Sequence, residues 1–235
     1  MNNPGLSGNR LLAGIIADGG EPPVTVFDLV SLPADRVLCD AGAMPAEIYF
    51  PVSGLISAMA VSLAGLAVEA ASVGREGIVG LPLFGGLRVS PFRLSVTIEG
   101  EAFRISHADL VRRMSTRPTI ESHLEGYRVR FGAQIAQTLL CNSLHTIVER
   151  CCRWLLGASD RSASLSLPIT HIRLAELLGV RRSTVTVAIR ELVDRGLIEA
   201  ARGNISIRDR SALEAAACPC FAEGGALFDH HSAQP

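Results

Sequence analysis

The spacing of hydrophobic positions changes near the middle of the chain, and this change predicts two kinds of structure. Between residues 24 and 108, short apolar runs are separated by Gly and Pro at intervals of 8–12 residues. The runs are 36–39, 48–52, 55–62, 66–73 and 94–98. Short runs with frequent turn signals are typical of an antiparallel barrel or sandwich. From Asp109 onward the period becomes helical, so we expect a β-rich half followed by helices.

One long helix is expected over 119–142, a stretch that contains no Pro. Apolar side chains recur along it at spacings of 4, 3 and 4, namely Ile120, Leu124, Tyr127 and Phe131. This is the spacing of a coiled-coil seam, so the sequence predicts that two copies of the chain pair through these four residues. Beyond Phe131 the seam meets Gln134 and Thr138, which leaves the register open there. A second helix is expected over 146–156, and a polar linker over 159–166.

The segment 167–207 has the signals of two short helices and a hairpin. Thr170 is suited to cap the first helix, and Gly179 stands where the chain must turn sharply. A second helix is expected from about Ser183 to Gly196, and two short strands then flank a tight turn at 202–204. This order predicts a helix-turn-helix followed by a two-stranded wing.

The second of these helices has one apolar face and one polar face. Val185, Ala188, Ile189 and Leu192 share the face that must pack inward. A helix N-terminus rich in Arg, Ser and Thr suits phosphate contact, and Arg also binds the edge of guanine. The predicted DNA-binding residues are Arg181, Arg182, Ser183, Thr184, Thr186, Val187, Arg190, Arg202 and Asn204. The alternative is a purely structural unit, which does not require such a cluster at one helix end.

The distribution of charge favours the same interpretation. Residues 142–212 hold 11 Arg against 7 acidic residues, whereas residues 1–108 hold 6 Arg against 10. A basic segment attracts the phosphate backbone of nucleic acids. No apolar run reaches the roughly 18 residues that cross a bilayer, so we expect a soluble, cytoplasmic protein with no membrane partner. Nucleophile-elbow, phosphate-loop and paired-carboxylate motifs are missing from the sequence, and we therefore do not expect an enzyme.

The six cysteines do not form an evident ligand set, and we expect neither a cofactor nor a metal. An iron–sulfur cluster needs about four closely disposed cysteines, and none precedes Cys39. Cys151 and Cys152 are adjacent on a helix and point about 100° apart, as small buried residues do. Cys218 and Cys220 leave a redox or metal role open, although no His or acidic partner stands near them in the sequence.

The stretch ITHIRLAELLGVRRSTVTVAIRELVDRGLIEAARGNISIRD (169–209) resembles the winged helix-turn-helix of the Crp/Fnr, or catabolite activator, family of regulators. The resemblance extends backward, because that family places a β-roll, a long dimer helix and a connecting helix before this part. It implies that Arg182, Ser183 and Val187 read bases and that Arg181 and Thr184 contact the DNA backbone. Ser183 replaces the acidic residue common at its position, so the operator of the best-known members is not implied.

The segment VGREGIVGLPLFGG (73–86) looks like the turn that precedes the family's phosphate-binding cassette. Members that bind cyclic AMP carry a Gly-Glu-Leu segment and an Arg-Ser pair there. This chain has Gly80-Leu81-Pro82 and Ser90-Pro91 instead, and Pro lacks a backbone donor. We therefore expect that cyclic AMP is not the physiological switch, and that the effector is another molecule or none. The candidate effector-pocket residues are Arg75, Glu76, Gly80, Arg88 and Arg93. For Arg75 and Glu76, the favoured alternative is an ion pair between them that stabilises the turn.

Together these patterns and the resemblance predict an α+β protein. The expected parts are an N-terminal segment (1–23), a cyclic-nucleotide-binding-like antiparallel β-roll (24–118), a dimerisation helix (119–142), a winged helix-turn-helix domain (143–212) and a C-terminal tail (213–235). The expected function is that of a homodimeric transcription regulator on a palindromic, double-stranded DNA operator, with RNA polymerase as a partner if it activates. The alternative is a regulator whose DNA binding strictly requires a cyclic nucleotide or another small molecule.

Overall fold

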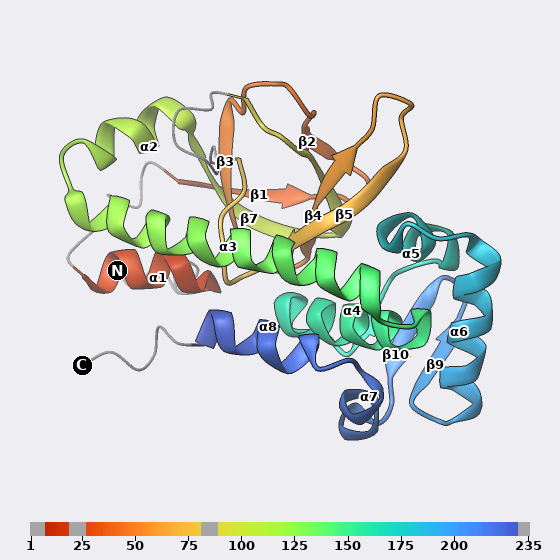
Figure 1. Cartoon of the computed structure of the whole chain (residues 1–235). Coiled ribbons are helices and arrows are strands. Elements are labelled where there is room, and N and C mark those ends of the chain that lie inside the picture. Colours follow the sequence, from red (N-terminus) through yellow and green to blue (C-terminus); the bar gives the residue numbers. More distant parts are fainter. Residues whose placement is uncertain (1–7, 19–26, 81–88, 230–235) are drawn as a thin grey trace.

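Two antiparallel sheets form most of the N-terminal half of the chain (Figure 1). The computed structural model describes residues 8–18, 27–80 and 89–229. One sheet has the order β1-β7-β3, with β1 at Asp28–Leu32, β7 at Gly100–Ser106 and β3 at Glu47–Pro51. The other has the order β2-β6-β4-β5, with β2 at Val37–Cys39, β6 at Arg93–Ile98, β4 at Leu55–Val61 and β5 at Ala67–Val73. The predicted antiparallel β structure is confirmed, although β1 and β7 lie outside the apolar runs that predicted it.

A short helix near the N-terminus is tied to the sheets. This helix, α1, spans Arg10–Ala17 and packs against the long helix α3, which spans Pro118–Leu144. Asn9 caps α1, because its Oδ1 accepts the N–H of Leu12 at 2.9 Å. Its Nδ2 donates to the carbonyl oxygens of Pro51 and Gly77, both at 2.8 Å. The N-terminal segment is thus held by hydrogen bonds from a fully buried side chain.

Helix α3 has 27 residues and lies between the sheets on one side and α8 on the other (Figure 1). The predicted dimer seam faces the chain's own core, with side chains only 0–3% exposed at Ile120, Leu124, Tyr127 and Phe131. The ring of Phe131, for example, meets that of Phe92 edge-on with centroids 6.2 Å apart. The assignment of these four residues to a dimer interface is therefore wrong. The spacing correctly identified an apolar face of the helix, but that face packs on its own β-sheets.

Helix α2 (His107–Met114) connects β7 to α3 and packs with the β-sheet unit, because its Leu110 lies in the core of that unit. The elements after α3 form a second, mostly helical unit, which begins with α4 (Ile147–Ser162). A capping box between Thr146 and Glu149 starts α4. The polar linker expected over 159–166 is wrong at its start, because α4 continues to Ser162 and buries Ser159. After α4 come β8 (Ser166–Leu167), α5 (His171–Leu178), α6 (Arg182–Asp194), β9 (Ile198–Ala201) and β10 (Asn204–Ile207), with sheet order β8-β10-β9.

The C-terminal part is helical over the residues that the structure describes. Helix α7 spans Arg210–Ala216, and α8 spans Cys220–Asp229 and packs back against α3. Leu213 of α7 is fully buried in the core of the helix-turn-helix unit. Most of the expected C-terminal tail thus belongs to α7 and α8, and the loose end expected at His230 and His231 lies outside the described residues. Among the described helices, none combines the length and the apolar character that a bilayer crossing requires.

Candidate nucleic-acid interface

Helices α5 and α6 form the predicted helix-turn-helix. Thr170 caps α5, since its Oγ1 accepts the N–H of Arg173 at 3.1 Å. Gly179 ends α5 in the left-handed region at φ 65°, where glycine is favoured. A Cβ at Gly179 would also lie 3.0 Å from Cγ2 of Val68, so the turn is tight against β5. The buried faces of the two helices then pack together through Leu174, Leu178, Val185, Ala188, Ile189 and Leu192.

The opposite face of α6 is exposed along its first three turns. Seven predicted DNA-binding residues lie there or at its N-terminus with exposed side chains, namely Arg181, Arg182, Ser183, Thr184, Thr186, Val187 and Arg190. Val187 is 69% exposed although its side chain is apolar. An exposed apolar side chain among Arg, Ser and Thr gives this face the means to contact both polar and methyl groups of a partner.

The N-terminus of α6 has no side-chain cap. Asn9, Ser106, Thr146, Thr170 and Asp209 cap α1, α2, α4, α5 and α7 in this way. Arg181 at the start of α6 does not, and neither does Arg117 at the start of α3. The first-turn N–H groups of α6 therefore lack a side-chain acceptor and carry the partial positive charge of the helix end. Within the described part of the chain, no ion pair involves Arg181, Arg182, Arg190 or Arg202. The arrangement suits an anion such as a phosphate.

The wing places Arg202 beside this face. Arg202 and Gly203 form the turn between β9 and β10 with φ values of 50° and 81°, and Arg202 is exposed. Asn204 is positioned differently, because its Nδ2 donates to Ser166 Oγ at 2.9 Å and to Ser206 Oγ at 3.0 Å. Its amide holds the wing to β8, so we keep Arg202 and not Asn204 in the contact surface.

A groove that the sequence did not predict joins the wing to the helix-turn-helix. Its volume is about 420 Å³, and it is lined by Thr170, His171, Ile172, Arg182 and residues 200–205. His171 lies beside α6, with Nδ1 3.2 Å from Oγ1 of Thr186. The sequence could have indicated His171 as an interface residue, because it directly follows Thr170, the N-cap of α5, and the start of α5 lies close to α6.

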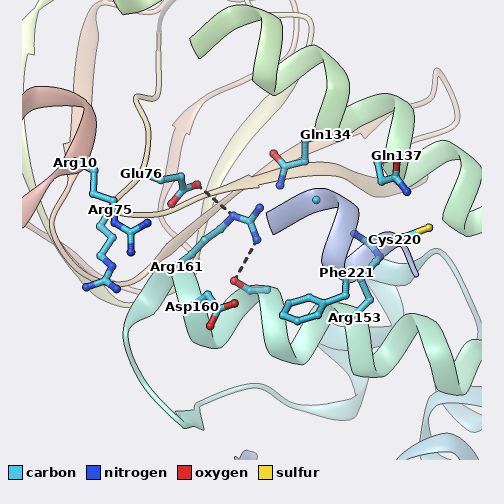
Figure 2. A pocket seen from close by; sticks show the side chains of 12 residues that line it. Arg10, Arg75, Glu76, Gln134, Gln137, Arg153, Asp160, Arg161, Cys220 and Phe221 are labelled. Carbon is cyan, nitrogen blue, oxygen red and sulfur yellow. Dashed lines mark hydrogen bonds and ion pairs between the residues drawn. The ribbon is translucent and has the colours of Figure 1, made fainter. Parts of the chain in front are cut away.

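A cavity of about 290 Å³ lies between the β-sheet unit and the helical unit (Figure 2). It is rich in guanidinium groups, and its lining includes Arg10, Arg75, Glu76, Gln134, Arg153 and Arg161. Glu76 accepts from the N–H of Gly74 at 3.1 Å and pairs with Nε of Arg161 at 3.2 Å. Glu76 therefore stabilises its turn as expected, but its ion-pair partner is Arg161 on α4 rather than Arg75. Nε of Arg75 is buried without a hydrogen-bond partner among the described residues.

The structure does not bring together the four candidate pocket residues that it describes. Arg75 and Glu76 line the cavity, whereas Gly80 is buried at φ 91°, where a Cβ would clash with the carbonyl oxygen of Glu47. Arg93 is exposed on β6 and pairs with Asp40 at 2.7 Å, so its assignment to the pocket is wrong. Arg88 lies outside the described residues.

Residues 149–216 match the family model of the Crp-like helix-turn-helix domain. FixK2 from Bradyrhizobium japonicum superposes with a TM-score of 0.70 at 16% identity, over 82% of this chain and 98% of that one. The c-di-GMP-responsive global regulator CLP of Xanthomonas campestris gives 0.64 at 18% identity, over 83% and 98%. A CRP-family transcriptional regulator of Thermus thermophilus gives 0.66 at 16% identity, over 80% and 96%. No curated protein sequence matches the chain significantly.

The order of a β-sheet unit, a long helix and a winged helix-turn-helix defines a class of DNA-binding transcription regulators. Residues 149–216 match the Crp-like helix-turn-helix domain, and the chain shares its overall fold, including a cyclic-nucleotide-binding-like N-terminal part, with solved regulators of the Crp/Fnr family. Members of this family are transcription factors rather than enzymes, and they bind DNA, typically as dimers.

Proposed function

We propose that the protein is a homodimeric, sequence-specific transcription regulator that inserts the N-terminal half of α6 into the major groove. The observation that carries this proposal is the exposed, uncapped start of α6. Arg182, Ser183 and Val187 are positioned to meet base edges, and a bidentate Arg–guanine contact is the strongest specific contact available to them. Arg181, Thr184 and the exposed Arg202 of the wing contact the phosphate backbone and fix the register. Thr186 and Arg190 extend the same face along the helix.

The outer face of α3 supports the dimer. Val129, Leu139 and Leu144 are 67%, 69% and 72% exposed although they are apolar, and Leu140 is exposed beside them. Positions 129, 132, 136 and 139 follow a spacing of 3, 4 and 3, which is that of a coiled-coil seam. Gly132 has open space where a Cβ would stand, so a second helix can approach closely there. This outer stripe, Val129, Gly132, Ala136, Leu139, Leu140 and Leu144, replaces the inner residues as the proposed interface.

A twofold dimer presents two copies of α6 to one face of DNA. The operator is then a palindrome whose half-site centres lie about one helical turn, ~34 Å, apart. RNA polymerase becomes a further partner where the bound dimer activates transcription. This role requires a location in the cytoplasm, where the DNA is.

The test is selection of DNA duplexes from a random pool by the purified wild-type chain, followed by footprinting. The expected result is an inverted repeat with two protected major-groove segments about one turn apart. Selected duplexes that share a motif without inverted symmetry would contradict the dimeric arrangement. Duplexes that share no motif would contradict sequence-specific recognition.

The proposal also concerns the effector, the molecule that controls DNA binding. We propose that the arginine-lined cavity senses an anionic small molecule, supported by the buried Nε of Arg75 that lacks a partner among the described residues. Cyclic AMP is not the expected ligand, because Leu81-Pro82 and Ser90-Pro91 replace the Glu and Arg-Ser of the phosphate cassette. Repeating the selection with and without cyclic AMP separates the alternatives. A motif obtained only with cyclic AMP would establish a strictly nucleotide-dependent regulator.

A further inference from the structure

Four metal-ligating side chains from distant parts of the sequence meet at the end of α3. Cys141 lies in the last turn of that helix, and His145 is its C-cap residue. Cys218 and Cys220 follow α7 and begin α8. The Sγ atoms of Cys141 and Cys218 are 3.5 Å apart, as are Sγ of Cys220 and Nδ1 of His145. All four donor atoms lie within 4.8 Å of one another.

These separations match a four-coordinate metal site. Zinc bound at about 2.3 Å from sulfur and about 2.0 Å from nitrogen places tetrahedral ligands roughly 3.5–3.8 Å apart. The observed distances therefore need only small side-chain movements to close on one ion. We propose that Cys141, His145, Cys218 and Cys220 form a Cys₃His site for zinc. Four protein ligands leave no open position, so the site is structural rather than catalytic.

The surroundings of the cluster supply positive charge. Three thiolates and one Zn²⁺ carry a net charge of −1, which a buried site must balance. Arg150 and Arg153 of α4 both act electrostatically on Cys141, and no carboxylate in the described part of the chain lies within ion-pair distance of either guanidinium. Arg150 is only 8% exposed. The cluster therefore lies within the electrostatic reach of two guanidinium groups.

The position of the site gives it a defined consequence. Cys141 and Cys218 are 77 residues apart, and the intervening segment contains the whole winged helix-turn-helix. A bound ion fastens the end of that segment to the end of α3. Arg150 extends the connection, because its guanidinium donates to the carbonyl oxygen of Leu178 at the end of α5. Cys220 and Arg153 also line the arginine-rich cavity (Figure 2), so the cluster lies next to that cavity.

The test is the metal content of the full chain, purified under reducing conditions without chelator. Elemental analysis is expected to find about one zinc per chain. Cobalt added to the chelator-treated chain is expected to produce the visible absorption bands of a tetrahedral cobalt–thiolate centre. Full-length protein with less than about one tenth of an equivalent of zinc and no such bands would overturn the proposal.

Variants distinguish a metal site from buried thiols. Cys141→Ser and Cys218→Ser are expected to lose the zinc, whereas His145→Cys keeps four donors and retains it. Cys39→Ser and Cys152→Ser are the matched controls, because both thiols are buried outside the cluster. Equal zinc content in Cys141→Ser and the controls would contradict the ligand assignment. A Cys141–Cys218 disulfide in zinc-free, freshly isolated protein would assign the cluster to redox chemistry and would likewise overturn the proposal.

Discussion

Glu69 is a carboxyl group buried where the helical unit meets the β-sheets. Its Oε1 accepts the indole N–H of Trp154 at 2.9 Å, and its Oε2 accepts the hydroxyl of Ser57. Burial raises the pKa of Glu69 above 4.5, while the hydrogen bonds from Ser57 and Trp154, together with Arg153 and Arg161, act in the opposite direction. The folded chain therefore binds this proton more tightly than the unfolded chain does.

This raised pKa predicts that stability falls with rising pH. The contribution of Glu69 is fully present below about pH 4.5 and is lost as pH increases through the raised folded-state pKa. Glu69→Gln removes the titration and keeps a side chain that can accept from Trp154 and hydrogen-bond to Ser57. The variant is expected to exceed the wild type in stability at neutral pH, with a difference that shrinks toward about pH 5.

Urea unfolding followed through Trp154, the chain's single tryptophan, measures this difference. Glu99→Gln is the control, because Glu99 is exposed. If the urea midpoints of Glu69→Gln and of the wild type change in parallel across the pH range, the prediction from the raised pKa of Glu69 is refuted.

At the scale of elements, α3 has two apolar faces with different partners. Leu124 is fully buried against the chain's own sheets, whereas Val129 and Leu140 are exposed on the outer stripe. Helical periodicity identifies side chains that share a face, but it does not identify what covers that face. Gly132 and Ala136 also make the outer stripe less hydrophobic than the inner one, so the sequence pattern drew attention to the wrong face.

The two faces are expected to respond differently to charge. Leu124→Glu places a carboxylate in the core of the subunit itself and is expected to unfold it at a cost of several kcal/mol. Val129→Glu combined with Leu140→Glu is expected to leave a folded monomer, because both side chains are exposed in the single chain. Sedimentation and thermal unfolding distinguish the two results. A double variant that still sediments as a dimer, or a monomeric wild type at micromolar concentration, would remove the outer stripe as the interface.

For the strands too, the local sequence pattern predicts some elements and misses others. The runs at 55–62 and 66–73 predicted β4 and β5 because these strands are apolar over most of their length. Strand β1 escaped prediction, since four of its five residues are not buried and its sequence carries no strong alternation. It exists because it pairs with β7, a contact between Asp28–Leu32 and Gly100–Arg104 that no local pattern reveals.

For the whole molecule, local signals predicted the DNA-binding unit and distant contacts determined the rest. The cap at Thr170, the turn at Gly179 and the hairpin at Arg202 each act within a few residues, so the sequence was sufficient for them. The Cys141–Cys218 contact spans 77 residues and needed the fold before it became visible. Contacts between the two units are equally distant, such as Arg173 Nη2 to Ser95 Oγ at 3.3 Å.

The central claim, that α6 reads DNA, is tested most directly by comparing Arg182→Ala with Arg181→Ala on the selected operator and on scrambled duplexes at several salt concentrations. Arg182→Ala is expected to cost about 1–3 kcal/mol on the operator and to flatten the preference at one base pair in each half-site. Arg181→Ala is expected to weaken all sequences alike and to lower the salt slope by about one. An unchanged sequence preference in Arg182→Ala would contradict the account, because the residue placed in the groove would then not read a base.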